Sequence, residues 1–410
     1  MTQPEGPSAP SEPAALCGGT VESRLAALSR LCAALPPRAR RGTNLHVHTN
    51  ESFSVFRSPS EAVWHSAREG LAVLGINDHY TVAGHEEFRR ACAVAGIRPA
   101  FSLEAVAMDR AALAAGLLLN DPDNPGRVYL CGKGVTRRPP EDSPAMQALA
   151  RMRGALAGRN REMAGRVAAL FRQRLGADGP AWEAVRALAP RGNVTERHVA
   201  RAAFLRLGEL AAGQAASAAA LAEWLCAAEP PAGAGDAALQ IFIRARLLKA
   251  GAPCYLPESE AAFVPFEELR GIFLAFGAIP TYPVLGNPVT AGERDLEKLL
   301  DGLAARGIFA VEVIPHRNTR ERLAEIVAAA RRRWWPVFNG TEHNTPEARP
   351  MLDPCALDPE FEPHFAASAA LLLGHQRLVA GGGPGFVDAD GRPTIPDARA
   401  RFEFFKNAGR

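Results

Sequence analysis

The sequence predicts an α/β protein in which parallel strands form a barrel that is interrupted by a large helical insertion. Three observations predict this fold class. From residue 44, apolar runs typical of buried strands alternate with helical segments. The stretch 144–250, rich in Ala, Leu, Arg and Glu, then has helical periodicity and no strand pattern. The strand–helix rhythm resumes after it, so the 410 residues are interpreted as one barrel with a helical lobe and terminal extensions.

The elements follow in order along the chain. A helix over 21–35 ends at Pro36-Pro37, and a second over 60–69 begins after Ser58-Pro59 and ends at Gly70. Helix 86–95 follows, and the tail 360–410 is expected to form two helices around a Gly-rich turn. We expect parallel strands with helical crossovers over 44–48, 71–77, 99–108, 128–135, 271–282, 308–314 and 335–339.

These elements divide the chain into five expected parts. They are a disordered tail and helix (1–40, disordered over 1–18), the first barrel half (41–140), the helical lobe (141–252), the second barrel half (253–350) and a helical extension (351–410).

Composition excludes several classes of protein. The chain has 47 Lys+Arg against 44 Asp+Glu and a formal net charge of +3, which argues against a nucleic-acid partner. The seven cysteines include no C-x-x-C pair, as expected for reduced thiols. The chain shows neither a signal peptide nor an apolar stretch long enough to span a membrane. The sequence therefore predicts a cytoplasmic protein with no membrane partner, and it does not indicate the oligomeric state.

Imidazole and carboxylate groups follow the ends of several predicted strands. The strand ends carry His46 and His48, Asp78 and His79, Glu104, and Glu342-His343-Asn344. Alternate strand residues point to the same side, so His46 and His48 can reach one ion. Each signal alone has a plainer explanation: Asp78 as a helix cap, Glu104 as a buried acid paired with an arginine. Their coincidence at the carboxyl ends of barrel strands favours a metal site.

At these residues the sequence resembles the PHP (polymerase and histidinol phosphatase) superfamily. The run N-L-H-V-H-T-N-E-S is similar to its first motif, G-I-N-D-H-Y-T-V-A-G-H-E-E-F to its second, and F-S-L-E to its third. The resemblance covers about residues 42–135, and more weakly 253–350. It implies a distorted (β/α)7 barrel, a cluster of two or three metal ions, often zinc, manganese or iron, and hydrolysis of a phosphate mono- or diester.

The sequence departs from the motifs of this family at several positions. The altered positions are Phe53 after the first motif, Cys131 and Lys133 near the fourth strand, Tyr282-Pro283 for a His-Pro pair, and Glu342-His343-Asn344 for D-x-H. His343 either replaces the lost ligand or points away. We therefore expect one or two divalent ions (Zn, Mn or Fe), with His46, His48, His79, Glu104, Glu342 and His343 as ligands.

Basic side chains near these strand ends are candidates to bind an anionic substrate. The segment Thr195–Arg201 is similar to an R-P-H-I-A-R segment in the inserted lobe of PHP phosphoesterases that act on nucleotides, which suggests that Arg197 contacts substrate. Arg317, Lys133 and Asn344 are further substrate-binding candidates. For each, a solvated helix face or polar loop is the alternative.

Three functions remain open at this stage. In the first, a metal-dependent phosphoesterase acts on a small phosphorylated substrate, with Asp78 near the metal and His198 or His316 as proton donor. In the second, an amidohydrolase-like enzyme cleaves a non-phosphate ester or amide. In the third, a catalytically degenerate barrel binds a metal or an anion.

Overall fold

A nearly closed, barrel-shaped sheet organises the computed structural model, which describes residues 12–213, 216–286 and 288–410. The ring strands, in spatial order, are β1 (Arg41–Val47), β2 (Leu71–His79), β3 (Arg98–Met108), β4 (Arg127–Lys133), β6 (Ile279–Val284), β7 (Val311–Val313) and β8 (Val337–Asn339). The short β5 (Val264–Pro265) pairs with β3 outside the ring. A parallel bridge between Val47 and Glu342 brings the chain after β8 back to β1. The fold is thus a distorted TIM-like barrel with a helical insertion, as the sequence predicts.

One ring strand runs against the others, which corrects the expectation of parallel strands throughout. β4 pairs antiparallel with both β3 and β6. The connection from β3 to β4 holds only the five-residue helix α4 (Arg110–Ala114). The connection, residues 109–126, is long enough for a parallel crossover, but such a crossover usually contains a helix that packs on the sheet, and α4 is too short for this role.

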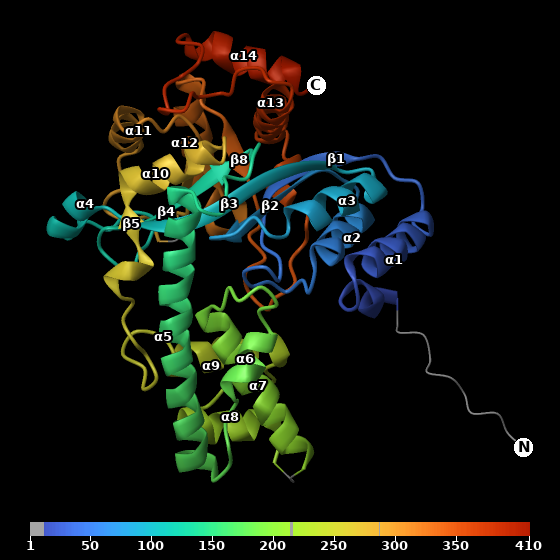
Figure 1. Ribbon diagram of the computed structural model, residues 1–410, viewed down its shortest axis with the longest axis vertical. Helices are drawn as coiled ribbons and strands as arrows, with labels where there is room; N and C mark the ends of the chain where they lie inside the picture. Colours follow the sequence, from blue (N-terminus) through green and yellow to red (C-terminus); the bar gives the residue numbers. More distant parts are fainter. Residues whose placement is uncertain (1–11, 214–215, 287) are drawn as a thin grey trace, which may run out of the picture.

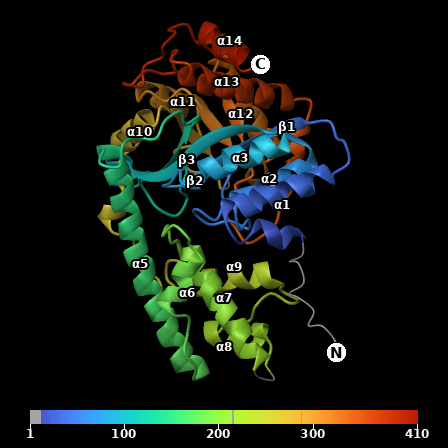
Figure 2. The same ribbon diagram turned by 45° about the vertical axis from the view of Figure 1, so that its right-hand side comes forward.

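The helices form three groups (Figures 1 and 2). Those beside the barrel are α1 (Val21–Ala33), α2 (Pro59–Glu69), α3 (His85–Ala95), α10 (Phe266–Ala275), α11 (Leu296–Ala305) and α12 (Arg320–Arg332). The C-terminal pair, α13 (Glu362–Ala380) and α14 (Ala398–Ala408), covers one end of the barrel. The lobe at the opposite end contains α5 (Pro144–Leu175), α6 (Trp182–Ala187), α7 (Glu196–Ala212), α8 (Ala218–Cys226) and α9 (Asp236–Leu247).

Local sequence signals explain several boundaries. The Ser58 side chain accepts a hydrogen bond from the Glu61 amide at the start of α2, and Gly70 ends that helix with φ +76°. The expected strand over 271–282 is wrong in its first part, because α10 extends to Ala275 and β6 begins at Ile279. Buried Phe266, Leu269, Ile272 and Phe273 follow helical spacing. The continuous apolar run GIFLAF hides this spacing, because a buried strand and a buried helix segment look alike over so few residues.

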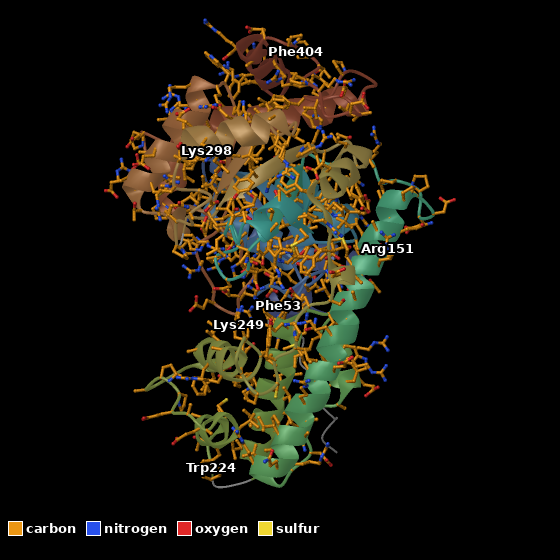
Figure 3. The ribbon with its side chains drawn as sticks, turned by 90° about the vertical axis from the view of Figure 1, so that its left-hand side faces the viewer. Phe53, Arg151, Trp224, Lys249, Lys298 and Phe404 are labelled. Carbon is orange, nitrogen blue, oxygen red and sulfur yellow. The ribbon has the colours of Figure 1, made fainter. Side chains whose placement is uncertain are left out.

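The lobe has a hydrophobic core of its own. Phe171, Val199, Leu225 and Ile243, from four different helices, belong to this cluster. α5 runs from the barrel along the whole lobe, so it joins the two parts, and Figure 3 shows Phe53 and Lys249 at their junction.

The expected disorder over 1–18 is wrong for Glu12–Leu16, which forms a 3-10 helix because Leu16 packs into a hydrophobic cluster. Residues 1–11 lie outside the described residues. Within the described chain no helix is long and apolar enough to span a membrane.

Candidate metal centre and adjoining cavity

Three predicted ligands meet at the end of the barrel that faces the lobe, and we call them the outer group: His46, His48 and Glu104. His46 Nε2 lies 3.0 Å from both His48 Nε2 and Glu104 Oε2, and His48 Nε2 lies 3.5 Å from the same carboxylate oxygen. All three side chains are buried. Their donor atoms fall within 4.8 Å of one another, a spacing that one ion can bridge.

The residues and register of three strands produce this meeting. His46 lies in β1 and His48 directly follows it, so alternation points both side chains into the barrel. Glu104 sits opposite His79 in the β2–β3 register. Gly340, after β8, lets the closing segment approach β1 closely, because a Cβ there would lie 2.1 Å from the Cβ of His46.

His79 extends the outer group toward solvent. Its ring centroid lies 4.5 Å from that of His48, and its Nδ1 lies 3.8 Å from Glu104 Oε1. This buried Nδ1 has no hydrogen-bond partner among the described residues. Burial lowers the pKa of His79 to about 3, so the ring is neutral and its lone pair is available. An unpartnered imidazole nitrogen beside two histidines and a carboxylate fits a divalent metal ion.

A second set of donors, which we call the inner group, shares His46 on its other ring nitrogen. His46 Nδ1 donates to Glu312 Oε2 at 2.9 Å, and the Cys131 thiol donates to the same oxygen at 3.2 Å. Lys133 forms an ion pair with the other oxygen of Glu312 and donates from Nζ to Leu45 O at 3.0 Å. Lys133 and Glu312 both have 0% exposure. Lys133 is therefore an interior residue and not part of the cavity lining, contrary to its predicted role.

Charge interactions set the protonation of these buried groups. Burial alone would lower the pKa of His46, but the Glu312 charge and hydrogen bonds to both carboxylates raise it to about 9. Burial disfavours the charged form of Glu104, yet His79 and the hydrogen bonds from His46 and His48 bring its pKa well below the usual range. Burial disfavours the charged form of Glu312 as well, and the charges of His46 and Lys133 again lower its pKa. In the metal-free protein His46 thus carries a proton that a metal ion must displace.

Asp78 supports the outer group from behind. Its carboxylate accepts hydrogen bonds from the Thr49 amide (2.7 Å), the Thr49 hydroxyl (2.7 Å) and the Ser52 hydroxyl (2.6 Å). Ser52 Oγ also lies 3.1 Å from His48 Nδ1. Asp78 therefore fixes the loop after β1 and, through Ser52, the ring of His48.

The segment after β8 does not bring its predicted ligands to the outer group. Glu342 pairs with Arg317 at 3.0 Å, so these two candidates neutralise each other. His343 has its Nδ1 2.7 Å from the Thr341 hydroxyl and its Nε2 3.0 Å from Arg349 O, and its ring packs on Phe56. Both ring nitrogens of His343 are therefore occupied away from the outer group.

The two predicted proton donors lie in different settings. His198 is buried at the start of α7, where its Nδ1 accepts from the Thr195 amide at 2.9 Å and its ring meets Phe53 edge-on. His198 therefore acts as a helix cap. His316 follows β7 in a 3-10 turn, Pro315–Arg317, and burial lowers its pKa.

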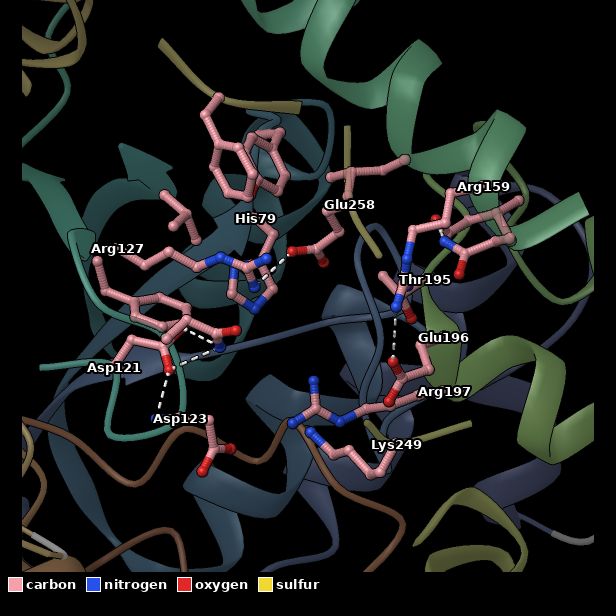
Figure 4. Close-up of a pocket in the computed structure, with 18 of the residues that line it drawn as sticks. His79, Asp121, Asp123, Arg127, Arg159, Thr195, Glu196, Arg197, Lys249 and Glu258 are labelled. Carbon is pink, nitrogen blue, oxygen red and sulfur yellow. Dashed lines mark hydrogen bonds and ion pairs between the residues drawn. The ribbon is translucent and has the colours of Figure 1, made fainter. Parts of the chain in front are cut away.

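A cavity of about 620 Å³ adjoins the outer group between the barrel and the lobe (Figure 4). His79 lines it and so links it to the outer group. Other lining residues are Tyr80, Tyr129, Asp121, Asp123, Arg127, Arg159, Asn193, Glu196, Arg197, Arg244, Lys249, Tyr255 and Glu258.

Two of the cations in this cavity lack an acidic partner. Arg127 pairs with Glu258 at 2.6 Å, and Arg244 pairs with Glu196 at 2.7 Å. Across the described chain, neither Arg197 nor Lys249 forms an ion pair; Arg197 contacts the amide oxygen of Asn344 at 3.5 Å. Figure 4 shows the two side chains next to each other. Burial, aided by the charge of Arg244, lowers the pKa of Arg197 to about 10, which leaves it charged at neutral pH.

Glu312 and Lys249 were not among the predicted site residues. An isolated acid in the apolar run IFAVEVI was a usable signal for Glu312, since a carboxylate is costly in such a strand unless it is paired. Lys249 is one of only four lysines, but it lies at the end of a helical segment where nothing local marks a cavity.

Comparison with known proteins defines the fold further. Searches of protein-family models and of curated proteins by sequence give no match. Among solved structures, a candidate metal-dependent phosphoesterase from Bifidobacterium adolescentis is similar, with TM-score 0.50 and 19% identity over 80% of this chain and 96% of that one. An amidohydrolase from Chromobacterium violaceum, solved with sulfate and no metal, has TM-score 0.52, 19% identity and the same coverage. The chain therefore has a fold that it shares with metal-dependent hydrolases.

Proposed function

We propose that this protein is a metal-dependent phosphoesterase of the PHP superfamily that acts in the cytoplasm on a small phosphorylated substrate. The observation that carries the proposal is the continuity of the outer group with a cavity that holds unpaired Arg197 and Lys249. A metal ion and uncompensated cations side by side suit a substrate with a compact negative charge.

His46, His48 and Glu104 would hold the ion, with His79 as a further ligand. When bound, a divalent ion supplies an activated water at neutral pH and withdraws charge from a phosphoryl oxygen. The candidates are Zn, Mn and Fe, which accept mixed imidazole and carboxylate donors.

The residues of the chain supply binding and orientation. Arg197 presents a planar fork of donors that matches two phosphate oxygens, and Lys249 adds a point charge beside it. Asn344 orients the Arg197 guanidinium through their contact. The lobe supplies part of the cavity lining, including Arg197 and Lys249. Neither predicted proton donor suits the leaving oxygen, because His198 is occupied in the helix cap and His316 does not line the cavity.

The test is an activity panel on chelator-treated protein reloaded with Mn²⁺ or Zn²⁺. We expect release of phosphate from at least one phosphomonoester or phosphodiester, and loss of this activity in His46→Asn. The matched control is His65→Asn, because His65 lies on α2, where it packs on Phe56 and Trp64. Absence of turnover on every phosphoester would refute the proposal.

The same panel tests the second candidate function. The likeness to an amidohydrolase gives a reason to include lactones and amides. Their hydrolysis, without hydrolysis of phosphoesters, would favour that function. Metal binding without any turnover would favour a degenerate barrel.

A further inference from the structure

The outer and inner groups compete for one imidazole. The outer group uses His46 Nε2 with His48 and Glu104, and the inner group uses His46 Nδ1 with Cys131 and Glu312. Both sets have donor atoms within 4.8 Å of one another and both are buried. Distance alone therefore permits two metal positions, and the surrounding charges decide between them.

A cation already neutralises the carboxylate of the inner group. The Lys133 ammonium pairs with Glu312, and both side chains have 0% exposure. A divalent ion on the inner group would share this carboxylate with the ammonium, at a short distance and with little water to screen their repulsion. It would also require the Cys131 thiol to give up the proton that it donates to Glu312 Oε2 at 3.2 Å.

The inner carboxylate also determines which nitrogen of His46 faces the outer group. Each ring nitrogen of His46 faces a carboxylate, Glu312 at Nδ1 (2.9 Å) and Glu104 at Nε2 (3.0 Å). When Glu104 serves as a metal ligand, Glu312 keeps the proton on Nδ1 and leaves the Nε2 lone pair for the same ion. Nε2 is the atom that lies 3.0 Å from His48 Nε2 and from Glu104. A carboxylate on the far nitrogen of a metal-binding histidine fixes the ring orientation and raises its basicity.

We propose that Glu312 and Lys133 are positioning residues that hold His46 for metal binding through Nε2, and that the Lys133 ammonium neutralises the inner carboxylate in place of a second metal ion, so that the protein binds one metal ion. This inference rests on the metal site of the proposed function and deepens it. Neither residue touches the substrate.

Cobalt titration of the metal-free, full-length protein tests the proposal. We expect one equivalent of Co²⁺ and an absorption spectrum without a thiolate-to-cobalt charge-transfer band. Cys131→Ser should leave both the stoichiometry and the spectrum unchanged, because the thiol is not a ligand.

A second set of variants tests the positioning role. Glu312→Gln should weaken Co²⁺ binding by about 10- to 100-fold. The double variant Glu312→Gln with Lys133→Met, which keeps the interior charge balanced, should show a similar loss. The control is Glu293→Gln, a buried glutamate that accepts from the Tyr282 hydroxyl at 3.1 Å and should leave Co²⁺ affinity unchanged. Nitrogen-15 NMR of His46 should show the proton on Nδ1 in the cobalt-free Zn²⁺ form of the wild type.

The outcomes separate this inference from the proposed function. Two equivalents of Co²⁺, with a thiolate band that Cys131→Ser removes, would overturn the inference and leave the outer metal site intact. Unchanged affinity in Glu312→Gln would overturn the positioning role. A wild-type protein that binds no Co²⁺ would overturn both proposals.

Discussion

Replacing Lys133 by methionine should destabilise the protein more than any single surface change. The substitution keeps most of the side-chain volume but removes the ammonium that faces Glu312. Both residues have 0% exposure, so the carboxylate loses one of its two counter-charges, Lys133 and His46, where water cannot replace it. Removing one partner of a buried ion pair costs about 3–5 kcal/mol. Since domains are stable by about 5–15 kcal/mol, this loss is a large fraction of the total.

A second substitution should reverse part of this loss. In Lys133→Met with Glu312→Gln no charge is left unpaired, and glutamine can still accept a hydrogen bond from His46. We expect the double variant to recover at least about 2 kcal/mol relative to the single one, since neutralising a buried pair is far less costly than breaking it.

Urea unfolding followed by circular dichroism measures the free energy of unfolding for each variant. The matched control is Arg138→Met, which breaks a surface pair with Glu141 between side chains that are 53% and 73% exposed. That change should cost no more than about 1 kcal/mol. The reasoning is refuted if Lys133→Met costs as little as the control, or if the double variant is no more stable than the single one.

Three further predictions concern the cavity, the pH dependence and the closure of the barrel. Arg197→Ala and Lys249→Ala should each raise the KM for a phosphoester by about 10- to 100-fold, as expected for a lost charged hydrogen bond of about 1.5–3 kcal/mol. An unchanged KM in steady-state kinetics would contradict the assignment of these residues to the substrate site. In metal-free protein, the pKa of His46 is raised to about 9, so its contribution to stability is full below about pH 6.5 and is lost as the pH rises through about 9. Urea unfolding at pH 7 and pH 10 should show a fall of about 3 kcal/mol that His46→Gln abolishes, and an equal fall in that variant would contradict the assignment. Gly340→Ala should impair both folding and metal binding, because its Cβ would lie 2.1 Å from the Cβ of His46. The control Gly154→Ala, in α5 with open space around it, should instead stabilise the helix by about 0.5–1 kcal/mol. Equal thermal stability of the two variants would argue against close packing at Gly340.

The barrel could be predicted because its evidence is local in the sequence. Apolar runs that end in polar residues mark each long strand, and caps such as Ser58 and Gly70 mark the helix between β1 and β2. The direction of β4 could not be predicted from such local evidence. The reversal of β4 depends on which residues of β3 and β4 pair, and the connecting residues 109–126 are long enough for a parallel crossover as well.

The outer group could be predicted for a similar reason. His46 and His48 alternate along one strand, and Glu104 interrupts an apolar one, so their chemistry stands out from their surroundings. The orientation of His343 could not be predicted, because it depends on a backbone with φ +56° and on a carbonyl at Arg349. Lys133 lies at the end of a strand, which led to the prediction that it contacts substrate. Its side chain instead pairs with Glu312, which belongs to a strand far along the chain.

The most direct test of the central claim is phosphate release by Mn²⁺-loaded protein, with bound metal measured in the same samples. The wild type should hold one Mn²⁺ and hydrolyse a phosphoester, and His48→Asn should lose bound metal and turnover together. Turnover that persists in His48→Asn without bound metal, or a fully metal-loaded wild type that releases no phosphate, would contradict the claim that His46, His48 and Glu104 form the catalytic metal site.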